Sequence, residues 1–250
     1  MSNAALFSTV AREYANFRAG YPAGLFEWLA QVAPAREAVW DAGCGSGQAS
    51  VGLAAHFTTV HATDISPEQL AAAKPHERVR YSVAPERASG LGASSVDLIT
   101  VAQALHWFDV EAFYDEARRV ARPAAVLAVW TYPRPRFTDP AFDALLEDFY
   151  AHIVGPYWPP GRRHIEAYYE SLPFPFKQLE APPFGLTLDW TLAQVLGYVS
   201  SWSATVRYRQ ARNEDPVPWL AERLGKVWPS PDVRLSLSMP LVLKAARIGA

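Results

Sequence analysis

Three alternating glycines follow an acidic residue in the stretch 38–48, which reads Ala-Val-Trp-Asp-Ala-Gly-Cys-Gly-Ser-Gly-Gln. The apolar run before Asp41 is typical of a buried strand, and the residues that follow Gln48 have helical spacing. Glycine reaches positive φ without penalty and lets a ligand lie directly on the backbone. Gly43, Gly45 and Gly47 therefore predict a ligand site at the point where a strand becomes a helix.

The spacing of these glycines decides between classes of ligand. A dinucleotide fingerprint needs its third glycine where Gln48 stands, and a phosphate-binding loop needs a Gly-Lys-Ser or Gly-Lys-Thr that is missing here. Asp41, two residues before the first glycine, instead favours a ligand that carries a cation. A second short strand ends in Asp64, where a carboxylate can accept both hydroxyls of a ribose. Ribose and cation without phosphate describe S-adenosylmethionine (SAM).

The motif Asp41-Ala-Gly43-Cys-Gly45-Ser-Gly47, with Asp64, resembles the cofactor motif of class I SAM-dependent methyltransferases. A later motif, Gln-Ala-Leu-His-Trp-Phe-Asp at 103–109, resembles the corresponding sequence in the branch that includes trans-aconitate methyltransferases and similar small-molecule enzymes. An aromatic and proline-rich block at 131–183 also resembles that branch, so the similarity covers essentially the whole chain. It implies a SAM-dependent methyltransferase that modifies a small-molecule acceptor.

The resemblance also implies a fold that would position these residues. We expect an α/β, Rossmann-like, doubly wound sheet of seven mostly parallel strands, with an antiparallel C-terminal strand and an irregular helical lid. A single domain would occupy 1–250, with N-terminal cap helices at 1–34 and the inserted acceptor lid at 131–183. The C-terminal strand, 233–244, contains Pro240, which predicts a bulge or a gap in pairing. Ala124 and Ala125 stand where most relatives have two glycines, which predicts an altered turn before the fifth strand.

The fourth strand should end beside the glycine-rich turn. The run 95–102 is almost continuously apolar, as in a strand that is buried on both faces, and it leads straight into Gln103. Ligands of open α/β sheets bind beyond the carboxyl ends of the strands, where the strand order reverses. In the implied fold this point lies between the first and fourth strands, so Gln103, His106 and Trp107 are expected to line the site.

The expected cofactor contacts come from all these segments. Asp41 would face the methionyl ammonium, Asp64 the ribose diol and Ile65 the adenine. The resemblance also implies contacts from Pro85 and Glu86, which follow the third predicted strand, 78–83. The complete set is Asp41, Gly43, Gly45, Gly47, Gln48, Asp64, Ile65, Pro85, Glu86, Gln103 and Ala104.

The expected catalytic residue is His106, as a base or as a residue that positions the acceptor; a packing role at a helix start is the alternative. The chain has 19 arginines against 4 lysines, and guanidinium groups suit planar carboxylates, which favours a carboxylated acceptor. Arg18, Arg134, Arg136, Arg162 and Arg163 fall in segments expected to cover the site. The proposed acceptor residues are Tyr14, Arg18, Trp107, Tyr132, Trp158 and Arg162.

Composition restricts the alternatives. A net charge of -2 gives no basic footprint, so nucleic acid is not an expected partner. Cys44 is the only cysteine, which excludes an internal disulfide and a cysteine metal cluster, and no His-Glu-x-x-His pair is present, so no metal is expected. No apolar run approaches the ~20 residues that span a bilayer, and no secretory signal is visible; we expect a cytoplasmic protein without membrane contact.

Two alternative functions and the oligomeric state stay open at this point. A SAM-binding module without activity would have the same motif. A nicotinamide-dependent dehydrogenase is less favoured, because Asp64 could hold its ribose but the third glycine is misplaced. The oligomeric state is left open.

Overall fold

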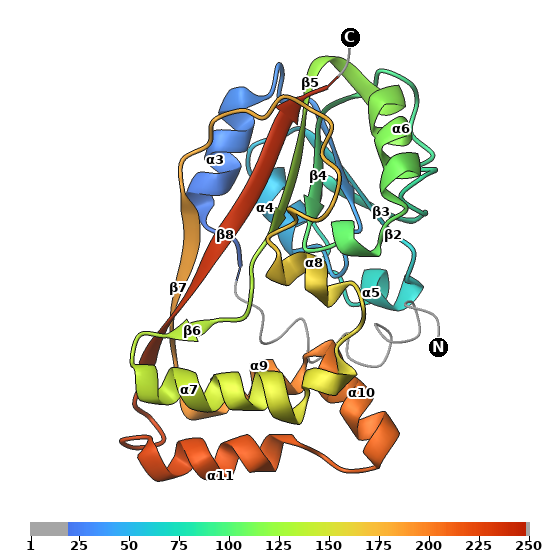
Figure 1. Ribbon diagram of the computed structural model, residues 1–250. Helices are drawn as coiled ribbons and strands as arrows, with labels where there is room; N and C mark the ends of the chain where they lie inside the picture. The colour runs from blue at the N-terminus through green and yellow to red at the C-terminus, as the bar shows by residue number, and fades with distance from the viewer. Residues whose placement is uncertain (1–19, 249–250) are drawn as a thin grey trace. The chain divides into compact units, whose positions relative to one another are not determined.

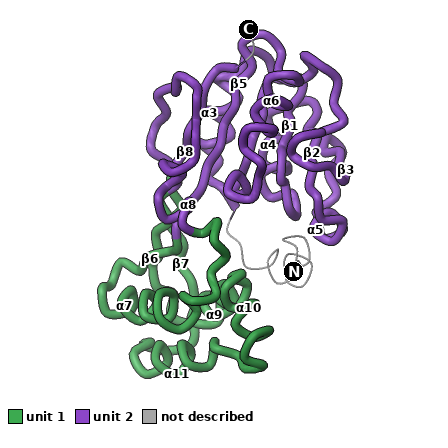
Figure 2. The backbone as a smooth tube through the Cα atoms, turned by 45° about the vertical axis from the view of Figure 1, so that its right-hand side comes forward, with its two compact units in different colours: residues 1–19, 134–162, 185–240 green, residues 20–133, 163–184, 241–250 purple. Residues whose placement is uncertain are grey.

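The computed structural model describes residues 20–248, which form two compact units (Figure 1 and Figure 2). Unit 1 contains Arg134–Arg162 and Gly185–Pro240, and unit 2 contains Gly20–Pro133, Arg163–Phe184 and residues 241–248. The segment predicted as one lid, 131–183, is thus divided between the units. The first predicted cap helix, with Tyr14 and Arg18, lies outside the described residues.

The sheet of unit 2 is Rossmann-like and doubly wound, as predicted. Its strands are β1 (Ala38–Ala42), β2 (Thr59–Asp64), β3 (Val79–Val83), β4 (Val96–Ala102), β5 (Ala121–Thr131) and the second half of β8 (Leu235–Arg247). They lie in the order β3-β2-β1-β4-β5-β8, parallel except for the antiparallel pair β5–β8. The order therefore reverses between β1 and β4, where the sequence predicted it.

The helices of unit 2 cover both faces of this sheet. Helices α3 (Ala23–Val32) and α4 (Gln48–Ala54) bury Leu25, Leu29 and Leu53 against one face. Helix α6 (Val110–Val120) buries Phe113 and Ala117 against the other. Strand β1 is consequently buried along its whole length, and β4 is buried up to its last residue, which explains their continuous apolar sequences.

Two short helices lie at the carboxyl edge of this sheet. Helix α5 (Pro67–Ala71) begins at Ser66, whose hydroxyl accepts the N–H of Gln69, with proline at the first helical position. The 3-10 helix η1 (Leu105–Trp107) follows β4.

Proline 240 interrupts the pairing of β8, as expected. Strand β5 pairs with β8 from Val242 onward, and β6 (Arg136–Phe137) pairs with Leu237 and Ser238. Strand β7 (Phe184–Trp190) also pairs with β8, so within the described residues the sheet has eight strands and not seven. The pairing of β6 with β8 was not predicted, because β6 is only two residues long and such a short strand has no recognisable alternation of apolar and polar residues.

The predicted altered turn falls inside β5, which begins at Ala121. Ala124 has φ +61°, in the left-handed region that glycine tolerates and that alanine adopts with strain. The register between β4 and β5 also shifts here, from the pair Val96–Ala121 to the pair Leu98–Val126. A difference in geometry from relatives with two glycines stays a prediction.

Unit 1 is mainly helical. It contains α7 (Pro140–Asp148), the π-helix η2 (Phe149–Ile153), the 3-10 helix η3 (Gly155–Tyr157), α9 (Leu192–Ser200), α10 (Ser203–Arg212) and α11 (Val217–Val227). Three helices follow β7, and Trp202 begins the second of them directly after the turn that ends α9. Helix α8 (Arg162–Glu166) begins at the last residue of unit 1 and continues in unit 2.

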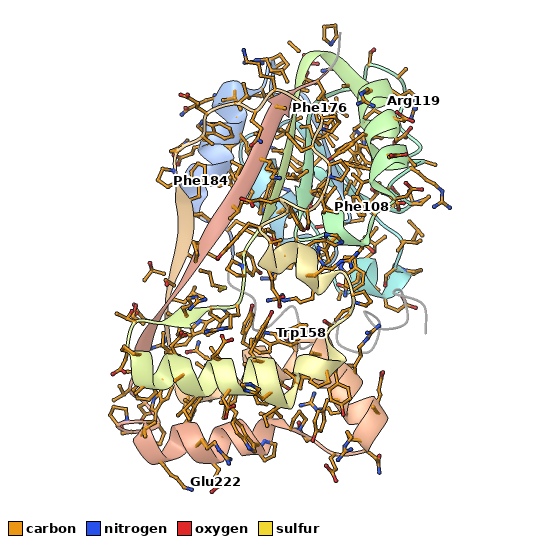
Figure 3. All side chains as sticks on the ribbon, viewed as in Figure 1. Phe108, Arg119, Trp158, Phe176, Phe184 and Glu222 are labelled. Atoms are coloured by element: carbon orange, nitrogen blue, oxygen red, sulfur yellow. The ribbon has the colours of Figure 1, made fainter. Side chains whose placement is uncertain are left out.

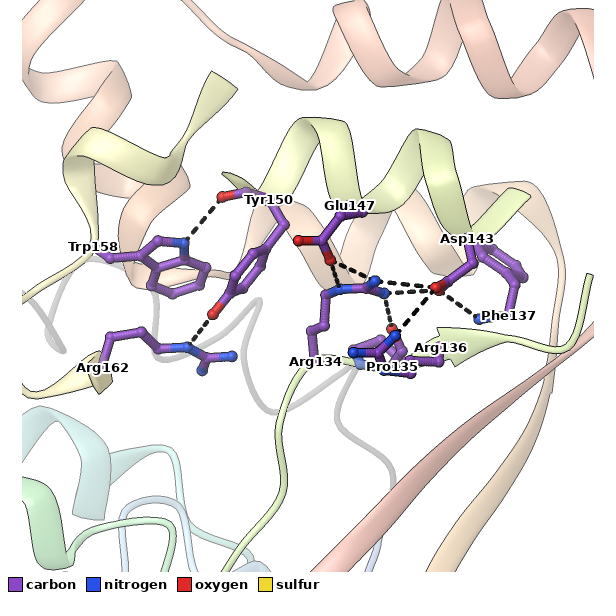
Figure 4. Close-up of polar contacts among 9 residues, drawn as sticks. All are labelled: Arg134, Pro135, Arg136, Phe137, Asp143, Glu147, Tyr150, Trp158 and Arg162. Atoms are coloured by element: carbon purple, nitrogen blue, oxygen red, sulfur yellow. Dashed lines mark hydrogen bonds and ion pairs between the residues drawn. The ribbon is translucent and has the colours of Figure 1, made fainter. Parts of the chain in front are cut away.

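Arg134 stabilises unit 1 from inside. Its side chain is buried and donates to Asp143 at 2.8 Å and to Glu147 at 2.6 Å, while Arg136 meets Asp143 at 3.6 Å (Figure 4). The carboxylates of α7 thus bind Arg134, which gives this arginine a structural role in unit 1, while the covering role of its segment stays a prediction.

Candidate active site

The glycine-rich turn joins β1 to α4 in left-handed backbone. Gly43, Gly45 and Gly47 have φ of +65°, +55° and +80°. A side chain at Gly43 would lie 2.8 Å from Cβ of Ala104 and 2.9 Å from the ring of Phe108, which is labelled in Figure 3. At Gly45 the nearest atom would be 3.7 Å away. Gly43 is therefore required for packing against the residues after β4, whereas a side chain at Gly45 would meet only ordinary contact and is excluded mainly by the left-handed backbone.

Asp64 ties the end of β2 to this turn. Its Oδ2 accepts the N–H of Gly45 at 2.8 Å and its Oδ1 accepts the N–H of Ser66 at 2.9 Å. Burial raises the pKa of Asp64, and the backbone donors from Ser66 and Gly45 oppose that effect. Each oxygen can accept a second hydrogen bond, so the carboxylate can hold the loop and a ribose hydroxyl together.

Asp41 is completely buried at the end of β1. Its Oδ2 accepts the hydroxyl of Ser50 at 2.5 Å, and its Oδ1 accepts the hydroxyl of Thr100, its register partner in β4, at 2.9 Å. Burial raises the pKa of Asp41 to about 6, although both hydroxyl donors act to lower it. The sequence did not predict these two partners. Contact of Asp41 with the methionyl ammonium stays a prediction.

Two exposed apolar side chains lie at the ends of adjacent strands. Ile65 follows β2 and Val83 ends β3, both are 58% exposed, and Asp64 pairs in register with Val83. An exposed aliphatic pair beside a carboxylate suits an adenosine, whose base is apolar on both faces and whose ribose carries the diol. A cofactor contact at Val83 was not predicted, although its position at a strand end, two residues before Pro85, was a signal that could have indicated it.

Pro85 and Glu86 continue this edge, and both are half-buried. Glu86 is engaged within the protein, where it accepts the N–H of Asp109 at 3.4 Å and meets Arg87 at 3.8 Å. Gln48 begins α4 directly after the glycines. The predicted roles of these three residues toward the cofactor stay predictions.

Gln103 joins the ends of β4 and β5. Its backbone is left-handed with φ +57°, its side-chain nitrogen donates to the carbonyl of Tyr132 at 3.1 Å, and its oxygen accepts the hydroxyl of Thr131 at 2.5 Å. Strained backbone of this kind is typical of functional sites. The side-chain amide and the backbone N–H of Gln103 are thus engaged by residues 130–132, and contact of Gln103 or Ala104 with the cofactor stays a prediction.

His106 lies in η1, after the end of β4. Its Nδ1 is 3.0 Å from the hydroxyl of Tyr169, and its ring lies 4.9 Å from that of Trp107. Tyr169 is buried and comes from the segment after α8. This segment is part of the predicted lid, 131–183, for which the sequence predicted no individual contact with His106. Tyr132 is also buried, with its ring 6.3 Å from that of Tyr21. His106, Trp107 and Tyr132 thus share unit 2 with the glycine-rich turn.

Two predicted acceptor residues lie in unit 1. The Arg162 guanidinium lies 4.5 Å from the centre of the Trp158 ring and 5.2 Å from that of Tyr150. Its Nε donates to the hydroxyl of Tyr150 at 2.7 Å, and the indole N–H of Trp158 donates to the carbonyl of Tyr150 at 3.2 Å (Figure 4). The guanidinium plane is therefore held by two aromatic rings.

Within residues 20–248 no group of three or more histidine, cysteine or acidic side chains is placed to hold a metal ion. Cys44 is buried, and burial raises the pKa of its thiol. In the same range no helix is both long and apolar enough to cross a membrane.

Comparison with known proteins decides the family. Residues 40–129 match the family described as a methyltransferase domain. A Dictyostelium discoideum protein that carries a methyltransferase name is 31% identical over 229 residues, which span 90% of this chain and 87% of that protein. The chain is a class I SAM-dependent methyltransferase.

Solved structures agree with this assignment. A structure from Anaeromyxobacter dehalogenans, named a type II methyltransferase, is 45% identical, has a TM-score of 0.85, and matches over 94% of this chain and all of that one. A phosphoethanolamine N-methyltransferase of Haemonchus contortus, solved with S-adenosylhomocysteine, is 16% identical with a TM-score of 0.50 and shows the fold alone. As a member of the SAM-dependent family, the methyltransferase uses SAM as its cofactor. Its place in the trans-aconitate branch stays a prediction.

The residues of unit 2 fit SAM. Asp64 keeps acceptor capacity for ribose hydroxyls, and Ile65 with Val83 offers an exposed apolar surface that suits adenine. The individual cofactor contacts stay predictions.

Proposed function

We propose that the methyltransferase transfers the methyl group of SAM to a carboxylate oxygen of a small-molecule acceptor and forms a methyl ester. The observation that carries this proposal is the Arg162 guanidinium, which is stacked on Trp158 and fixed by the hydroxyl of Tyr150. A guanidinium presents a rigid fork of donors that matches a planar carboxylate. Because Arg162 is already ordered, less conformational entropy is lost when an acceptor binds. Trp158 would supply the apolar surface beside the charge.

A carboxylate acceptor also limits the chemistry that the protein must perform. Bound SAM would supply a methyl group on a positively charged sulfur: the carboxylate oxygen would bond to the methyl carbon, the carbon–sulfur bond would break, and neutral S-adenosylhomocysteine would leave with the electron pair. Carboxylates have ordinary pKa values near about 4, so an acceptor of this class is ionised at neutral pH and needs no base. Alignment of the two reactants in a site that excludes water can contribute about 7–11 kcal/mol to lowering the barrier.

The protein residues then bind and orient. Asp64 holds the ribose diol while it fixes the N–H of Gly45, and Asp41 balances the methionyl ammonium from below the turn. His106 positions the acceptor, whereas a phenol, amine or carbon acceptor would need a general base, a role that His106 can fill only with an unprotonated ring nitrogen facing that acceptor. The size of its effect on turnover thus distinguishes the classes of acceptor.

The small-molecule class rests on composition. A net charge of -2 offers no basic surface for a nucleic acid backbone. We also infer a cytoplasmic location, which is supported by the low cysteine content: Cys44 is the single cysteine of the sequence.

The test is a screen of fractionated metabolites with SAM labelled in its methyl group. The proposal expects a labelled product that loses its label on mild alkaline hydrolysis, as esters do. On that acceptor, Arg162→Lys keeps the charge but loses the fork and should raise KM about tenfold or more, the scale of one charge-assisted hydrogen bond. Arg18→Ala and Arg162→Ala complete the series.

Arg223 provides a matched control in unit 1. Its guanidinium lies 3.9 Å from the centre of the Trp219 ring, so it is another arginine on a tryptophan. Arg223→Lys should leave KM unchanged. A neutral acceptor whose turnover ignores both Arg18→Ala and Arg162→Ala would overturn the carboxylate proposal and leave the methyltransferase assignment intact.

A further inference from the structure

His106 and Tyr169 are joined across unit 2 although they are far apart in the sequence. His106 comes from η1 and Tyr169 from the segment after α8, and Nδ1 of the histidine is 3.0 Å from the tyrosine hydroxyl. The two rings lie 6.0 Å apart, centre to centre. Tyr169 is 1% exposed and packs in the core cluster that also contains Leu105, the neighbour of His106.

The position of Tyr169 is maintained against backbone strain. Tyr168 and Tyr169 have φ of +51° and +61°, and the left-handed region costs roughly 1–2 kcal/mol for each residue that has a side chain. The N–H of Tyr169 donates to the carbonyl of His164 at 2.7 Å, and Nζ of Lys244, on β8, donates to the carbonyl of Tyr169 at 2.8 Å. Contacts from α8 and from β8 thus fix the residue that meets His106.

Elementary acid–base chemistry gives the direction of the hydrogen bond. A phenol, with an ordinary pKa of about 10, is a far stronger acid than the N–H of a neutral imidazole, and an imidazole nitrogen is a far stronger base than a phenol oxygen. The stronger arrangement is therefore O–H of Tyr169 donating to Nδ1 of His106. The tautomer of a histidine is set by the partner of its other nitrogen.

We propose that Tyr169 is a positioning residue for methyl transfer, whose hydroxyl donates to Nδ1 of His106 and keeps the proton of the neutral imidazole on Nε2. In this tautomer Nε2 donates a hydrogen bond and cannot accept a proton. The role in turnover rests on the proposed function, because a donor suits a carboxylate oxygen and a base would not be needed. The tautomer itself is independent of the acceptor.

The test is nitrogen NMR of the full chain labelled with ¹⁵N-histidine, recorded near pH 8, well above the ordinary histidine pKa of about 6.5. The chain has 6 histidines, and comparison with His106→Gln assigns the signals of His106. The wild-type protein should show His106 with a protonated Nε2 and an unprotonated Nδ1. Tyr169→Phe keeps the packed ring and removes the hydroxyl, so the Nδ1 signal should move toward the average of the two tautomers.

Tyr168→Phe is the matched control, because Tyr168 is the adjacent tyrosine, has the same left-handed backbone and is 39% exposed. It should leave the His106 signals unchanged. A proton on Nδ1 in the wild-type protein overturns the proposal without any variant, and unchanged His106 signals in a folded Tyr169→Phe protein do so as well.

Turnover tests the positioning role separately. On an acceptor found with labelled SAM, Tyr169→Phe should lower kcat about five- to tenfold, the scale of one hydrogen bond, and leave the calorimetric Kd for SAM unchanged. Equal kcat in Tyr169→Phe and Tyr168→Phe would overturn the role in turnover. Failure of the screen would count against the proposed acceptor and not against the tautomer.

Discussion

Oδ2 of Asp64 accepts the backbone N–H of Gly45 at 2.8 Å, so the acid at the end of β2 holds the second glycine of the turn after β1. The two motif elements that sequence analysis assigned to one ligand are therefore bonded directly to each other. Loss of the carboxylate should affect the cofactor twice, through the ribose contact and through the shape of the turn.

Asp64→Ala should accordingly weaken SAM binding by about 1.5–3 kcal/mol, or roughly 10- to 150-fold in Kd, because hydrogen bonds to a charged group are lost. Isothermal titration calorimetry with SAM and with S-adenosylhomocysteine measures the change. Asp64→Asn retains one oxygen acceptor, so its affinity for SAM should lie between those of the wild-type protein and Asp64→Ala. Wild-type affinity in Asp64→Ala would exclude the ribose contact.

Asp41 should make stability depend on pH. Burial raises its pKa from 3.8 to about 6, so between these values the folded protein binds more protons than the unfolded chain. The free energy of unfolding contributed by this group must then fall as pH rises from about 4 to about 6, by about 2–3 kcal/mol. Asp41→Asn should lack this fall.

Urea unfolding of both proteins at several pH values checks this prediction. The difference in unfolding free energy between wild-type and Asp41→Asn separates the effect of Asp41 from that of other acids. One of these is Glu116, whose pKa is lowered to about 2, mainly by Arg119. Glu116 therefore loses its stabilising effect only in stronger acid. Parallel curves for the two proteins between about pH 4 and 6 would show that Asp41 titrates normally.

Ala124→Gly should stabilise the protein. Alanine pays roughly 1–2 kcal/mol at the observed φ of +61°, and glycine removes most of this strain at an entropic cost of about 0.5–1 kcal/mol. We expect a net gain of about 0.5–1 kcal/mol in the free energy of unfolding, measured with urea. Ala125→Gly, at a buried residue outside the left-handed region, is the control and should destabilise. A loss of stability in both variants would contradict the strain.

Gly47→Ala and Gly90→Ala should differ in cost. Both glycines are left-handed, with φ of +80° and +77°, so each alanine brings similar backbone strain. A side chain at Gly47 would also collide with the ring of Tyr81, whereas at Gly90 there is open space within 4 Å. Gly90→Ala should cost about 1–2 kcal/mol and Gly47→Ala more, by thermal or urea unfolding. Equal costs would mean that Tyr81 moves aside freely.

The strand, turn and helix that carry the cofactor motif were predictable from sequence because their signals are local. A strand, three glycines and a second acid follow one another in a short stretch, and the fold requires only that β1 and β4 be neighbours. The partners of Asp41 were missed because Ser50 and Thr100 carry ordinary hydroxyls whose role appears only when α4 and β4 are in place.

The remaining residues depend on tertiary contacts without a periodic pattern. Tyr169 meets His106 only because two consecutive residues take left-handed backbone, which sequence does not predict for tyrosine. Arg134 was expected to cover the site by its residue type, yet the carboxylates of Asp143 and Glu147 on α7 bind it inside unit 1.

The path of the chain has a consequence for engineering. In the part of the chain that the structure describes, the backbone passes between the units at 133/134, 162/163, 184/185 and 240/241. The stretch Arg163–Phe184, with Tyr169, thus belongs to unit 2 but is encoded between the two halves of unit 1. A chimera that takes unit 1 from a relative must therefore be built as two separate transplants, since replacing 134–240 as one cassette would also exchange the tyrosine that contacts His106.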